Sequence, residues 1–313
     1  MDYVIGLDGG GTKTEALAID LSGAELGTWT GGPGNPHAVT FATASAELGR
    51  LLNTVKDALP GHRCMAVCAG LAGVDTPEER STMERYLTQT LTGSAYEGVS
   101  LLIKNDAEIA LKAALGSSQG IIAIAGTGSI IYAFDSEGNK YRAGGWGHLL
   151  GDQGSGYDIG LSVLQTVMKS YDGVLPATVL TEAVLQKHGI RDAAELRGIV
   201  YQPGVQKAQI AEHAEFAVRA AAAGDKLARQ IIVRSAEDLA DLVVALRNRH
   251  PELDRLKIGA AGSIFAYCPL FYDTFRVSVS QEDDLSDVVL SGRRSSAGAA
   301  DYARELAASQ GAK

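Results

Sequence analysis

Residues 4–19 have the sequence VIGLDGGGTKTEALAI. An apolar run ends at Asp8, three glycines follow, and Thr12, Lys13 and Thr14 lead into a second apolar run. A P-loop and a Rossmann glycine turn both lead into a helix, whereas the residues after these glycines have the pattern of a strand. The stretch therefore predicts a β-hairpin whose tip is made of glycine.

The composition of this tip suits a bound phosphate. Glycines have no Cβ atom, so their backbone N–H groups can approach an anion closely. The hydroxyls of Thr12 and Thr14 add donors, Lys13 adds a positive charge, and Asp8 at the strand end can hold Mg²⁺ directly or through water. The alternative is an ordinary hairpin turn, for which two residues suffice and three glycines would be costly in conformational entropy.

Length, charge and cysteine content narrow the class of protein. The 313 residues are enough for two domains, and a hydrophobic content of 46% leaves ample surface for a core. The formal net charge of −9 argues against a nucleic-acid or membrane-surface partner, and the sequence predicts no signal peptide or membrane span. Three cysteines suit a reducing cytoplasm. Cys64 and Cys68 lie in a predicted strand. They are expected to be buried thiols, and the alternative is that they bind a metal or a cluster.

The order of predicted elements indicates a repeated unit. Strands are expected at residues 2–8, 13–20 and 24–30, after which helices and strands alternate to about Leu115. A second run of three strands begins with GIIAIAG, and residues 153–249 are expected to be mostly helical. Further expected elements are strands in LKIGAAGSI (256–264) and FRVSVS (275–280) and a closing helix over 295–309. The chain thus predicts two β-β-β units, with a large helical insertion in the second.

The second unit repeats the glycine tip. AGTGSI, residues 125–130, separates its first two strands as GGGTKT does in the first unit. One such turn is common in proteins and carries little information. Two of them in one chain predict two hairpins that face each other across a cleft and hold the two ends of a triphosphate.

A carboxylate follows a predicted strand in KNDAEIAL, residues 104–111. Asn105 or Asp106 can simply cap the helix that begins there. In a kinase, a lone carboxylate such as Asp106 can instead accept the proton of an attacking hydroxyl. The sequence leaves both interpretations open.

Two further glycine-rich segments suit ligands. GGWGHLLGDQGSGYDIG, residues 144–160, predicts a binding loop, or else a turn at a sheet edge. Trp146 offers an apolar plate for a sugar ring, and Asp152 offers a carboxylate for hydroxyl groups. GAAGSI, residues 259–264, fits a glycine turn lying against a flat ring such as adenine, or an ordinary strand-to-helix turn.

Taken together, these segments resemble the N-acetylglucosamine kinases of the sugar kinase/chaperone/actin ATPase superfamily. GLDGGGTKTE, KNDAEIAL, AGTGSI, GGWGHLLGDQGSGYDIG and AAGSI occur in the order of that family, and the resemblance spans about residues 3–300. It implies two RNase-H-like (actin-like ATPase) α/β lobes with ATP in the cleft between them. The expected lobes are residues 1–116 with a C-terminal helix at 294–313, and residues 117–293 with the helical insertion.

The resemblance also implies a role for each matching residue. Asp106 would be the catalytic base, and Asp8 would organise Mg²⁺, directly or through water. The implied ATP-binding residues are Gly10, Gly11, Thr12, Lys13, Gly126, Thr127, Gly262 and Ser263. The implied sugar-binding residues are Asn35, Asp106, Ser129, Gly145, Trp146 and Asp152. Ile130 departs from the pattern, because the animal enzymes carry Asn there, and this puts one polar sugar contact in doubt.

The function implied is ATP- and Mg²⁺-dependent phosphorylation of an N-acetylated amino sugar at its 6-hydroxyl, in amino-sugar or cell-wall sugar salvage. N-acetylglucosamine is the first candidate, with N-acetylmuramic acid and glucosamine as alternatives. The resemblance also implies a homodimer, and the cysteine content suits a cytoplasmic protein. Two other interpretations stay open: an Fe–S-dependent activator ATPase of an acyl-CoA reductase or dehydratase, a domain type that shares this fold, and a non-catalytic sugar sensor.

Overall fold

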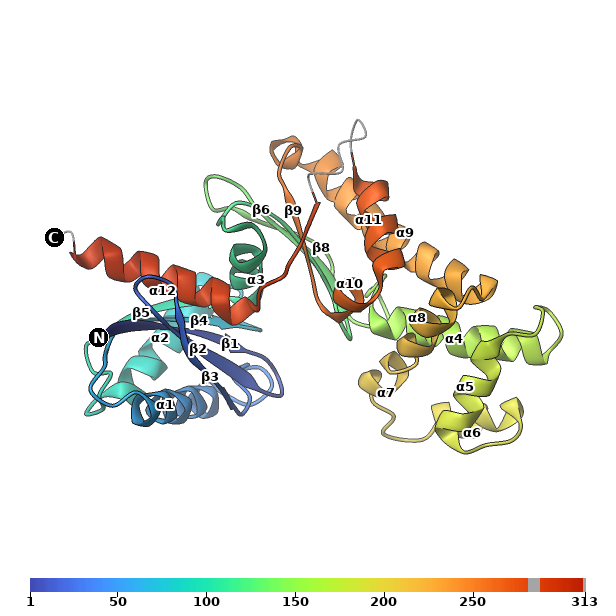
Figure 1. Cartoon of the computed structure of the whole chain (residues 1–313), viewed down its shortest axis with the longest axis horizontal. Coiled ribbons are helices and arrows are strands. Elements are labelled where there is room, and N and C mark those ends of the chain that lie inside the picture. Colours follow the sequence, from blue (N-terminus) through green and yellow to red (C-terminus); the bar gives the residue numbers. More distant parts are fainter. Residues whose placement is uncertain (281–287, 312–313) are drawn as a thin grey trace. The chain divides into compact units, whose positions relative to one another are not determined.

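The computed structural model describes residues 1–280 and 288–311 (Figure 1). The chain divides into two compact units, Met1–Ser118 with Ser291–Lys313 (unit 1) and Gln119–Leu290 (unit 2). Each unit contains one five-stranded sheet with helices packed on it. The α/β class predicted from the sequence is therefore confirmed.

The sheet of unit 1 has the strand order β3-β2-β1-β4-β5. Its strands are β1 (Asp2–Gly9), β2 (Thr14–Asp20), β3 (Glu25–Gly31), β4 (Arg63–Leu71) and β5 (Ser100–Asn105). The first three pair antiparallel, and β4 and β5 extend the sheet in parallel from β1. Because Gly9 pairs with Thr14, the predicted hairpin is confirmed and residues 10–13 form its tip.

Helices cover both faces of this sheet. They are α1 (Phe41–Ala58), α2 (Pro77–Leu91), α3 (Asp106–Leu115) and α12 (Ser295–Gly311). Side chains alternate along β1, so Ile5 packs in the core beneath α1 and α2, while Val4 packs in the core beneath α3 and α12. A Cβ atom at Gly6 would come within 2.2 Å of the backbone of Ser296 and Ala300, so α12 lies directly on the strand (Figure 1). Of the expected C-terminal helical part, residues 312–313 lie outside the described residues.

Unit 2 repeats this topology with the strand order β8-β7-β6-β9-β10. Its strands are β6 (Gly120–Ala125), β7 (Ser129–Phe134), β8 (Lys140–Gly144), β9 (Ile258–Ala261) and β10 (Val288–Leu290). The first three again pair antiparallel, and β9 and β10 again extend the sheet in parallel. The architectural duplication predicted from the sequence is thereby confirmed.

The predicted helical insertion lies between β8 and β9. Its helices are α4 (Gly156–Tyr171), α5 (Val179–His188), η1 (Ala193–Glu195), α6 (Leu196–Val200), α7 (Lys207–Ala211), α8 (Ala214–Ala222), α9 (Lys226–Arg249) and η2 (Pro251–Leu253). The fully buried side chains of Val163 in α4, Ala217 in α8 and Ile232 in α9 belong to one core together with Ile121 of the sheet. The insertion and the sheet therefore share a single hydrophobic core.

The strand predicted at residues 275–280 is wrong, because this segment belongs to helix α11 (Pro269–Val279), which follows α10 (Ser263–Tyr267). Phe271, Phe275 and Val279 are buried at a spacing of four residues, whereas Val277 is 63% exposed. That periodicity is helical, and Pro269 at the first helical position suits a helix start.

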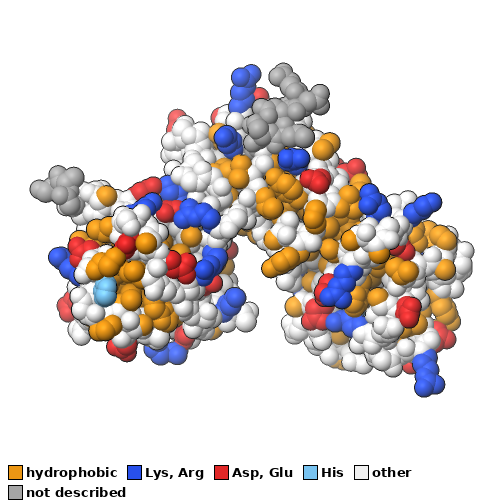
Figure 2. All heavy atoms as spheres, viewed as in Figure 1, with side chains coloured by type: hydrophobic (Ala, Val, Ile, Leu, Met, Phe, Trp, Pro, Cys, Tyr) orange, Lys and Arg blue, Asp and Glu red, His pale blue; other side chains and the backbone are white. Residues whose placement is uncertain are grey.

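The surface carries charges of both signs. On the face shown in Figure 2, acidic and basic side chains are interspersed over both units. Among the described residues, none of the helices is sufficiently long and apolar to cross a membrane.

Candidate functional site

The glycine tip of unit 1 is closed by its own backbone. The N–H of Gly10 donates to the carbonyl of Lys13 at 2.9 Å. The carbonyl of Gly10 in turn accepts the N–H groups of Gly34 and Asn35, at 3.0 and 3.1 Å. Gly11, Thr12 and Lys13 are left exposed at the end of the hairpin. The tip is thus held in place, with its backbone open to a ligand and Asn35 anchored beside it.

Thr14 differs from its expected role as a donor to phosphate. Its side chain is fully buried, and its hydroxyl donates to the carbonyl of Gly32 at 2.8 Å. A Cβ atom at Gly34 would lie 2.7 Å from the same hydroxyl, so the segment after β3 packs tightly on the hairpin. Thr14 therefore ties the two segments together, and Thr12 is the exposed hydroxyl of the tip.

The carboxyl groups of Asp8 and Asp106, both expected in the site, lie close enough in unit 1 for the charge of Asp106 to affect Asp8. Burial, together with the negative charges of Asp106 and Glu15, raises the pKa of Asp8 to about 7, against a lowering effect of Lys13. A buried carboxyl group beside other acids is a place where a cation gains stability. The donor set fits Mg²⁺, which takes one or two protein carboxylates and completes its shell with phosphate oxygens and water.

Asn105 is the N-cap of α3, a role for which the sequence offered both Asn105 and Asp106. Its side-chain oxygen accepts the N–H of Ala107 at 2.9 Å and closes a capping box with Glu108. Asp106 follows as the first residue of α3 and is half-buried, and its own carboxylate also contacts the N–H of Ala107. Asp106 is therefore placed at the carboxyl end of β5 while the capping role belongs to Asn105.

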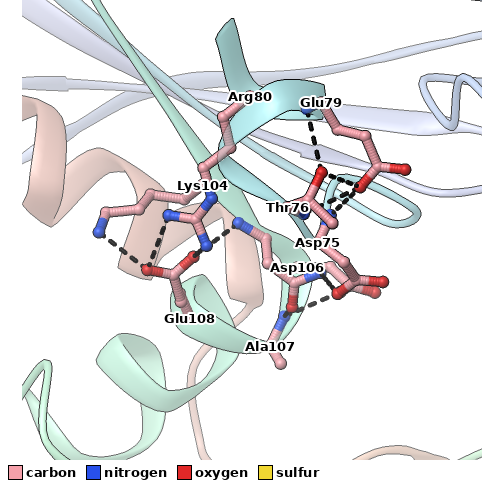
Figure 3. A network of polar contacts seen from close by, with 9 residues as sticks. Asp75, Thr76, Glu79, Arg80, Lys104, Asp106, Ala107 and Glu108 are labelled. Atoms are coloured by element: carbon pink, nitrogen blue, oxygen red, sulfur yellow. Dashed lines mark hydrogen bonds and ion pairs between the residues drawn. The ribbon is translucent and has the colours of Figure 1, made fainter. Parts of the chain in front are cut away.

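A network of ion pairs fixes this cap (Figure 3). Glu108 is bound by Lys104 at 2.8 Å and by Arg80 at 2.6 Å. Although burial opposes it, the charge of Lys104 lowers the pKa of Glu108, so this carboxyl group is ionised. The amide of Asn105 donates to Asp75 at 3.1 Å, which links the cap to the segment before α2. Sequence reasoning did not identify this support of Asp106.

Asn35 is oriented by a backbone contact. Its side-chain oxygen accepts the N–H of His37 at 2.8 Å. A Cβ atom at Gly73 would lie 2.6 Å from that oxygen, so the amide also packs against the loop after β4. His37 in turn contacts Glu79 of α2 at 2.8 Å. The side chain of Asn35, which was expected to bind the sugar, therefore has a fixed orientation within unit 1.

In unit 2 the second glycine turn lies against the start of α4. The carbonyl of Gly126 accepts the N–H of Gly156 at 2.7 Å, and that of Thr127 accepts the N–H of Tyr157 at 3.3 Å. Gly262 lies on the other side, with a φ of +103°, and a Cβ atom there would be 2.2 Å from the carbonyl oxygen of Ala125. The AGTGSI and AAGSI segments are therefore adjacent, because β6 and β9 end at the same edge of the sheet.

A pocket of about 650 Å³ lies beside Ser263 in unit 2. Apolar side chains contribute to its wall, among them Phe216, Ile264 and Tyr267. Tyr267 is 78% exposed. The apolar part of this lining suits a heterocyclic ring, and the pocket lies on α10, which directly follows Gly262.

The loop after β8 brings Gly145 and Trp146 to the same sheet edge. A Cβ atom at Gly145 would lie 2.4 Å from the side chain of Ile130, so this glycine is required by a close approach. Arg142 holds the loop by donating to the carbonyls of Gly144 at 3.0 Å and Gly145 at 2.5 Å. The guanidinium of Arg142 also stacks on Trp146, 4.1 Å from the ring centre. Sequence reasoning did not identify Arg142 as part of the site. One face of Trp146 is thus covered by a cation.

Ser129 and Asp152 are both buried in this loop region. The hydroxyl of Ser129 donates to the carbonyl of Gln153 at 2.6 Å, so it holds the loop to β7. Asp152 has a φ of +61° and forms an ion pair with Lys207 at 2.5 Å. Sequence reasoning did not identify Lys207, since it lies in the helical insertion and in none of the motifs.

The structure gathers the predicted residues into two sets, one in each unit. Unit 1 carries Asp8, Gly10, Gly11, Thr12, Lys13, Asn35 and Asp106. Unit 2 carries Gly126, Thr127, Ser129, Gly145, Trp146, Asp152, Gly262 and Ser263. Within each set the residues lie at one edge of the sheet, where the first strand and its parallel neighbours have their carboxyl ends.

Comparison with known proteins gives these two sets a context. The family model of the BadF/BadG/BcrA/BcrD ATPases matches residues 5–282. The chain belongs to this ATPase family. It is 33% identical over 286 residues to an N-acetylmuramic acid/N-acetylglucosamine kinase of Clostridium acetobutylicum, covering 88% of this chain and 90% of that protein. An N-acetyl-D-glucosamine kinase of Dictyostelium discoideum is 35% identical over 253 residues, with coverages of 77% and 78%.

A solved structure supports the fold. A ROK family glucokinase from Streptomyces griseus, determined with glucose and AMPPNP, superposes with a TM-score of 0.57. At 19% identity it covers 97% of this chain and 99% of its own. This likeness over nearly the whole of both chains supports an actin-like ATPase fold for this member of the BadF/BadG/BcrA/BcrD family.

The three cysteines of this ATPase lie apart from one another. Burial raises the pKa of Cys64 to about 12 and raises the pKa of Cys68 as well. These thiols stand four residues apart on β4, about 13 Å along the strand, and Cys268 is buried in unit 2. Among the described residues, no group of three or more His, Cys, Asp or Glu could hold a metal ion. Cys68 and Cys268 pack as buried apolar groups and Cys64 is half-buried, so the iron–sulfur interpretation gains no support.

Proposed function

We propose that this chain transfers the γ-phosphoryl group of ATP to the 6-hydroxyl of an N-acetylated amino sugar. N-acetylglucosamine is the first candidate substrate, with N-acetylmuramic acid and glucosamine as alternatives. Two relatives that match most of the chain are named as kinases of such sugars. The observation that carries the mechanism is the position of Asp106, half-buried at the end of β5 and within electrostatic range of Asp8.

Unit 1 provides the acid–base and metal chemistry of the proposal. Asp106 accepts the proton of the sugar hydroxyl, and Asn35 hydrogen-bonds the sugar. Gly10, Gly11, Thr12 and Lys13 lie along the β- and γ-phosphates. Asp8 would hold Mg²⁺, directly or through water, and the ion would neutralise charge on the phosphate chain.

Unit 2 provides the remaining contacts. Gly126 and Thr127 face the phosphates, and the pocket beside Gly262 and Ser263 receives adenosine. Gly145, Trp146 and Asp152 bind the sugar, with Ser129 holding their loop to β7. We assign the two lobes to residues 1–116 with 294–313 and to residues 117–293.

The function is tested by kinetics with ATP, Mg²⁺ and a panel of amino sugars, with ADP release and the phosphorylated sugar both measured. Asp106→Asn should lower kcat by about 10²–10⁴-fold, the usual contribution of a general base. Asp172→Asn, an exposed aspartate after α4, is the matched control and should keep the activity of the parent. A kcat within about tenfold of the parent for Asp106→Asn would overturn the assignment.

The proposed setting is amino-sugar or cell-wall sugar salvage in the cytoplasm, carried out by a homodimer. Sedimentation equilibrium of the purified chain measures the oligomeric state. A non-catalytic sugar sensor would bind amino sugar without producing ADP. The same kinetic experiment therefore separates the two.

A further inference from the structure

Lys207 lies at the second glycine turn without belonging to it in sequence. It is the first residue of α7, in the helical insertion. A Cβ atom at Gly128 would lie 2.6 Å from the Lys207 Nζ atom and 3.4 Å from a carboxylate oxygen of Asp152. The ammonium group therefore lies directly over the backbone of the AGTGSI turn, in the space that a side chain at residue 128 would enter.

The duplicated topology gives this position a meaning. The tip of unit 1, GGGTKT, contains its own cation in Lys13, whereas the AGTGSI tip of unit 2 contains none. The two tips connect equivalent strands, β1 with β2 and β6 with β7. The AGTGSI tip thus lacks a positive charge of its own, and Lys207 supplies one. This lysine lies 79 residues after Gly128 in the chain.

The partner of Lys207 is held in a defined place. Asp152 is 3% exposed and is the one described residue other than glycine with a positive φ. Its carbonyl accepts the N–H of Ser155, which caps α4. A non-glycine residue in this conformation persists where the surroundings determine it, and such residues cluster at functional sites. The Asp152 carboxylate is therefore a fixed point from which the ammonium group extends toward the turn.

The charge of Lys207 is accessible to a ligand. Its side chain is 29% exposed, whereas that of Asp152 is 4% exposed. An ammonium group has three N–H donors, and the contact with Asp152 at 2.5 Å engages one of them. The same group can therefore bind a phosphate oxygen and the carboxylate at once.

We propose that Lys207 is the phosphate-binding cation of unit 2, and that its ion pair with Asp152 couples phosphate binding to sugar binding. The coupling between the two ligands rests on the proposed function, because it takes Asp152 as a sugar ligand. The phosphate contact of Lys207 does not depend on sugar turnover, since it concerns the affinity of the free protein for the phosphate chain of a nucleotide.

Calorimetric titration with AMPPNP, ADP and adenosine tests the phosphate contact in Lys207→Met. A charge-assisted hydrogen bond to phosphate predicts a loss of AMPPNP affinity of about ten- to a hundredfold, with adenosine affinity unchanged. Lys112→Met is the matched control, because Lys112 forms an ion pair with Glu305 at 2.6 Å in unit 1. This control should bind all three ligands as the parent does. Equal AMPPNP affinity in Lys207→Met and the parent would overturn the proposal.

Steady-state kinetics separates this role from a purely structural one. If Lys207 only oriented Asp152, Lys207→Met would raise the KM for sugar and leave nucleotide affinity intact, which would also overturn the proposal. In Asp152→Asn the ammonium is released from its carboxylate, so AMPPNP affinity should stay equal or increase while the KM for sugar rises at least about tenfold. Lys207→Arg, which keeps the charge, should recover part of the lost affinity. A parent protein that binds AMPPNP and phosphorylates no sugar contradicts the proposed function alone.

Discussion

The side chain of Ile130 fills the space in which a side chain at Gly145 would have to lie, since the two are separated by 2.4 Å when a Cβ atom is built on the glycine. Ile130 is half-buried on β7, directly after Ser129, and its strand partner in β8 is Gly144. An apolar wall therefore borders the loop that carries Trp146. Ile130 is the residue noted in the sequence as a departure, because the animal enzymes of the family that the chain resembles carry Asn there.

Ile130→Asn tests what this wall does for substrate choice. An amide at this position adds a polar contact toward the sugar, and one hydrogen bond corresponds to roughly a two- to tenfold lower KM for N-acetylglucosamine. Ile130→Val is the control, because it keeps the apolar wall and nearly the same volume. Kinetics over the amino-sugar panel measures both. A KM for Ile130→Asn that equals that of Ile130→Val would show that residue 130 does not face the sugar.

Gly262→Ala tests the adjacency of the two glycine segments of unit 2. The new Cβ atom would lie 2.2 Å from the carbonyl oxygen of Ala125, in addition to the strain of a φ near +103°. We expect a loss of about 2 kcal/mol or more in the free energy of unfolding, together with weaker ATP binding. Gly224→Ala is the matched control, since its φ is +92° and no atom lies within 4 Å of its Cβ position.

The control should lose only about 1 kcal/mol, the cost of the backbone conformation, and keep its ATP affinity. Urea unfolding monitored by circular dichroism gives the stabilities, and calorimetry gives the affinities. Equal destabilisation of the two variants would contradict the close packing of Gly262 on β6.

Arg142→Met tests the clamp on the glycine-rich loop. The variant loses two hydrogen bonds to backbone carbonyls of that loop and the stacking on Trp146. Because the loop carries Asp152, we expect the KM for sugar to rise by roughly five- to twentyfold, about 1–2 kcal/mol. Lys140→Met is the control, since Lys140 stacks on Tyr132, 4.2 Å from its ring centre, on the same hairpin.

Kinetics with sugar as the varied substrate measures the effect, and the control should keep the KM of the parent. If Arg142→Met also kept that KM, the orientation of Trp146 by Arg142 would be irrelevant to sugar binding.

The fold was predictable where local signals agree with tertiary packing. The strand pairs around both glycine tips follow from apolar runs broken by turn residues, and Thr76, Pro77 and Glu79 mark the start of α2 as the structure has it. The error at residues 275–280 has a physical cause. Phe275, Val277 and Val279 alternate as in a strand, and the helix is identified by the exposure of Val277 and the burial of Phe271 one turn earlier, both of which depend on tertiary packing.

The candidate site was predictable only in its motifs. Glycines, Asp106 and Asp152 stand in segments whose composition is unusual, so they attract attention in the sequence. Lys207 and Arg142 stand in ordinary surroundings, and their importance depends on which loop the fold brings to them. The three-residue strand β10 was missed for a similar reason, because its pairing with β9 depends on a partner about 30 residues away.

A pair of histidines predicts how stability depends on pH. His188 and His213 contact each other through their Nε2 atoms at 2.8 Å, and the Nδ1 atom of His213 contacts the carbonyl of Ile210 at 3.0 Å. Burial lowers the pKa of both rings, and the nearby charge of Lys187 lowers it further, while Glu212 acts in the opposite direction on His188. Both rings are therefore neutral in the folded protein near neutral pH.

In the unfolded chain these rings take up protons at the ordinary histidine pKa of about 6.5. Their contribution to stability is thus complete above that pH and is lost as the pH falls below it, because the unfolded state then binds more protons. Between pH 7.5 and pH 5.5 the two histidines should lower the urea midpoint of the parent, whereas Asp8, whose pKa in the folded protein is raised to about 7, acts in the opposite direction. The double variant His188→Gln/His213→Gln keeps Asp8 and loses the histidine contribution, so its midpoint at pH 5.5 relative to that at pH 7.5 should be higher than in the parent. An identical change of midpoint in both proteins would assign the pH dependence to other groups.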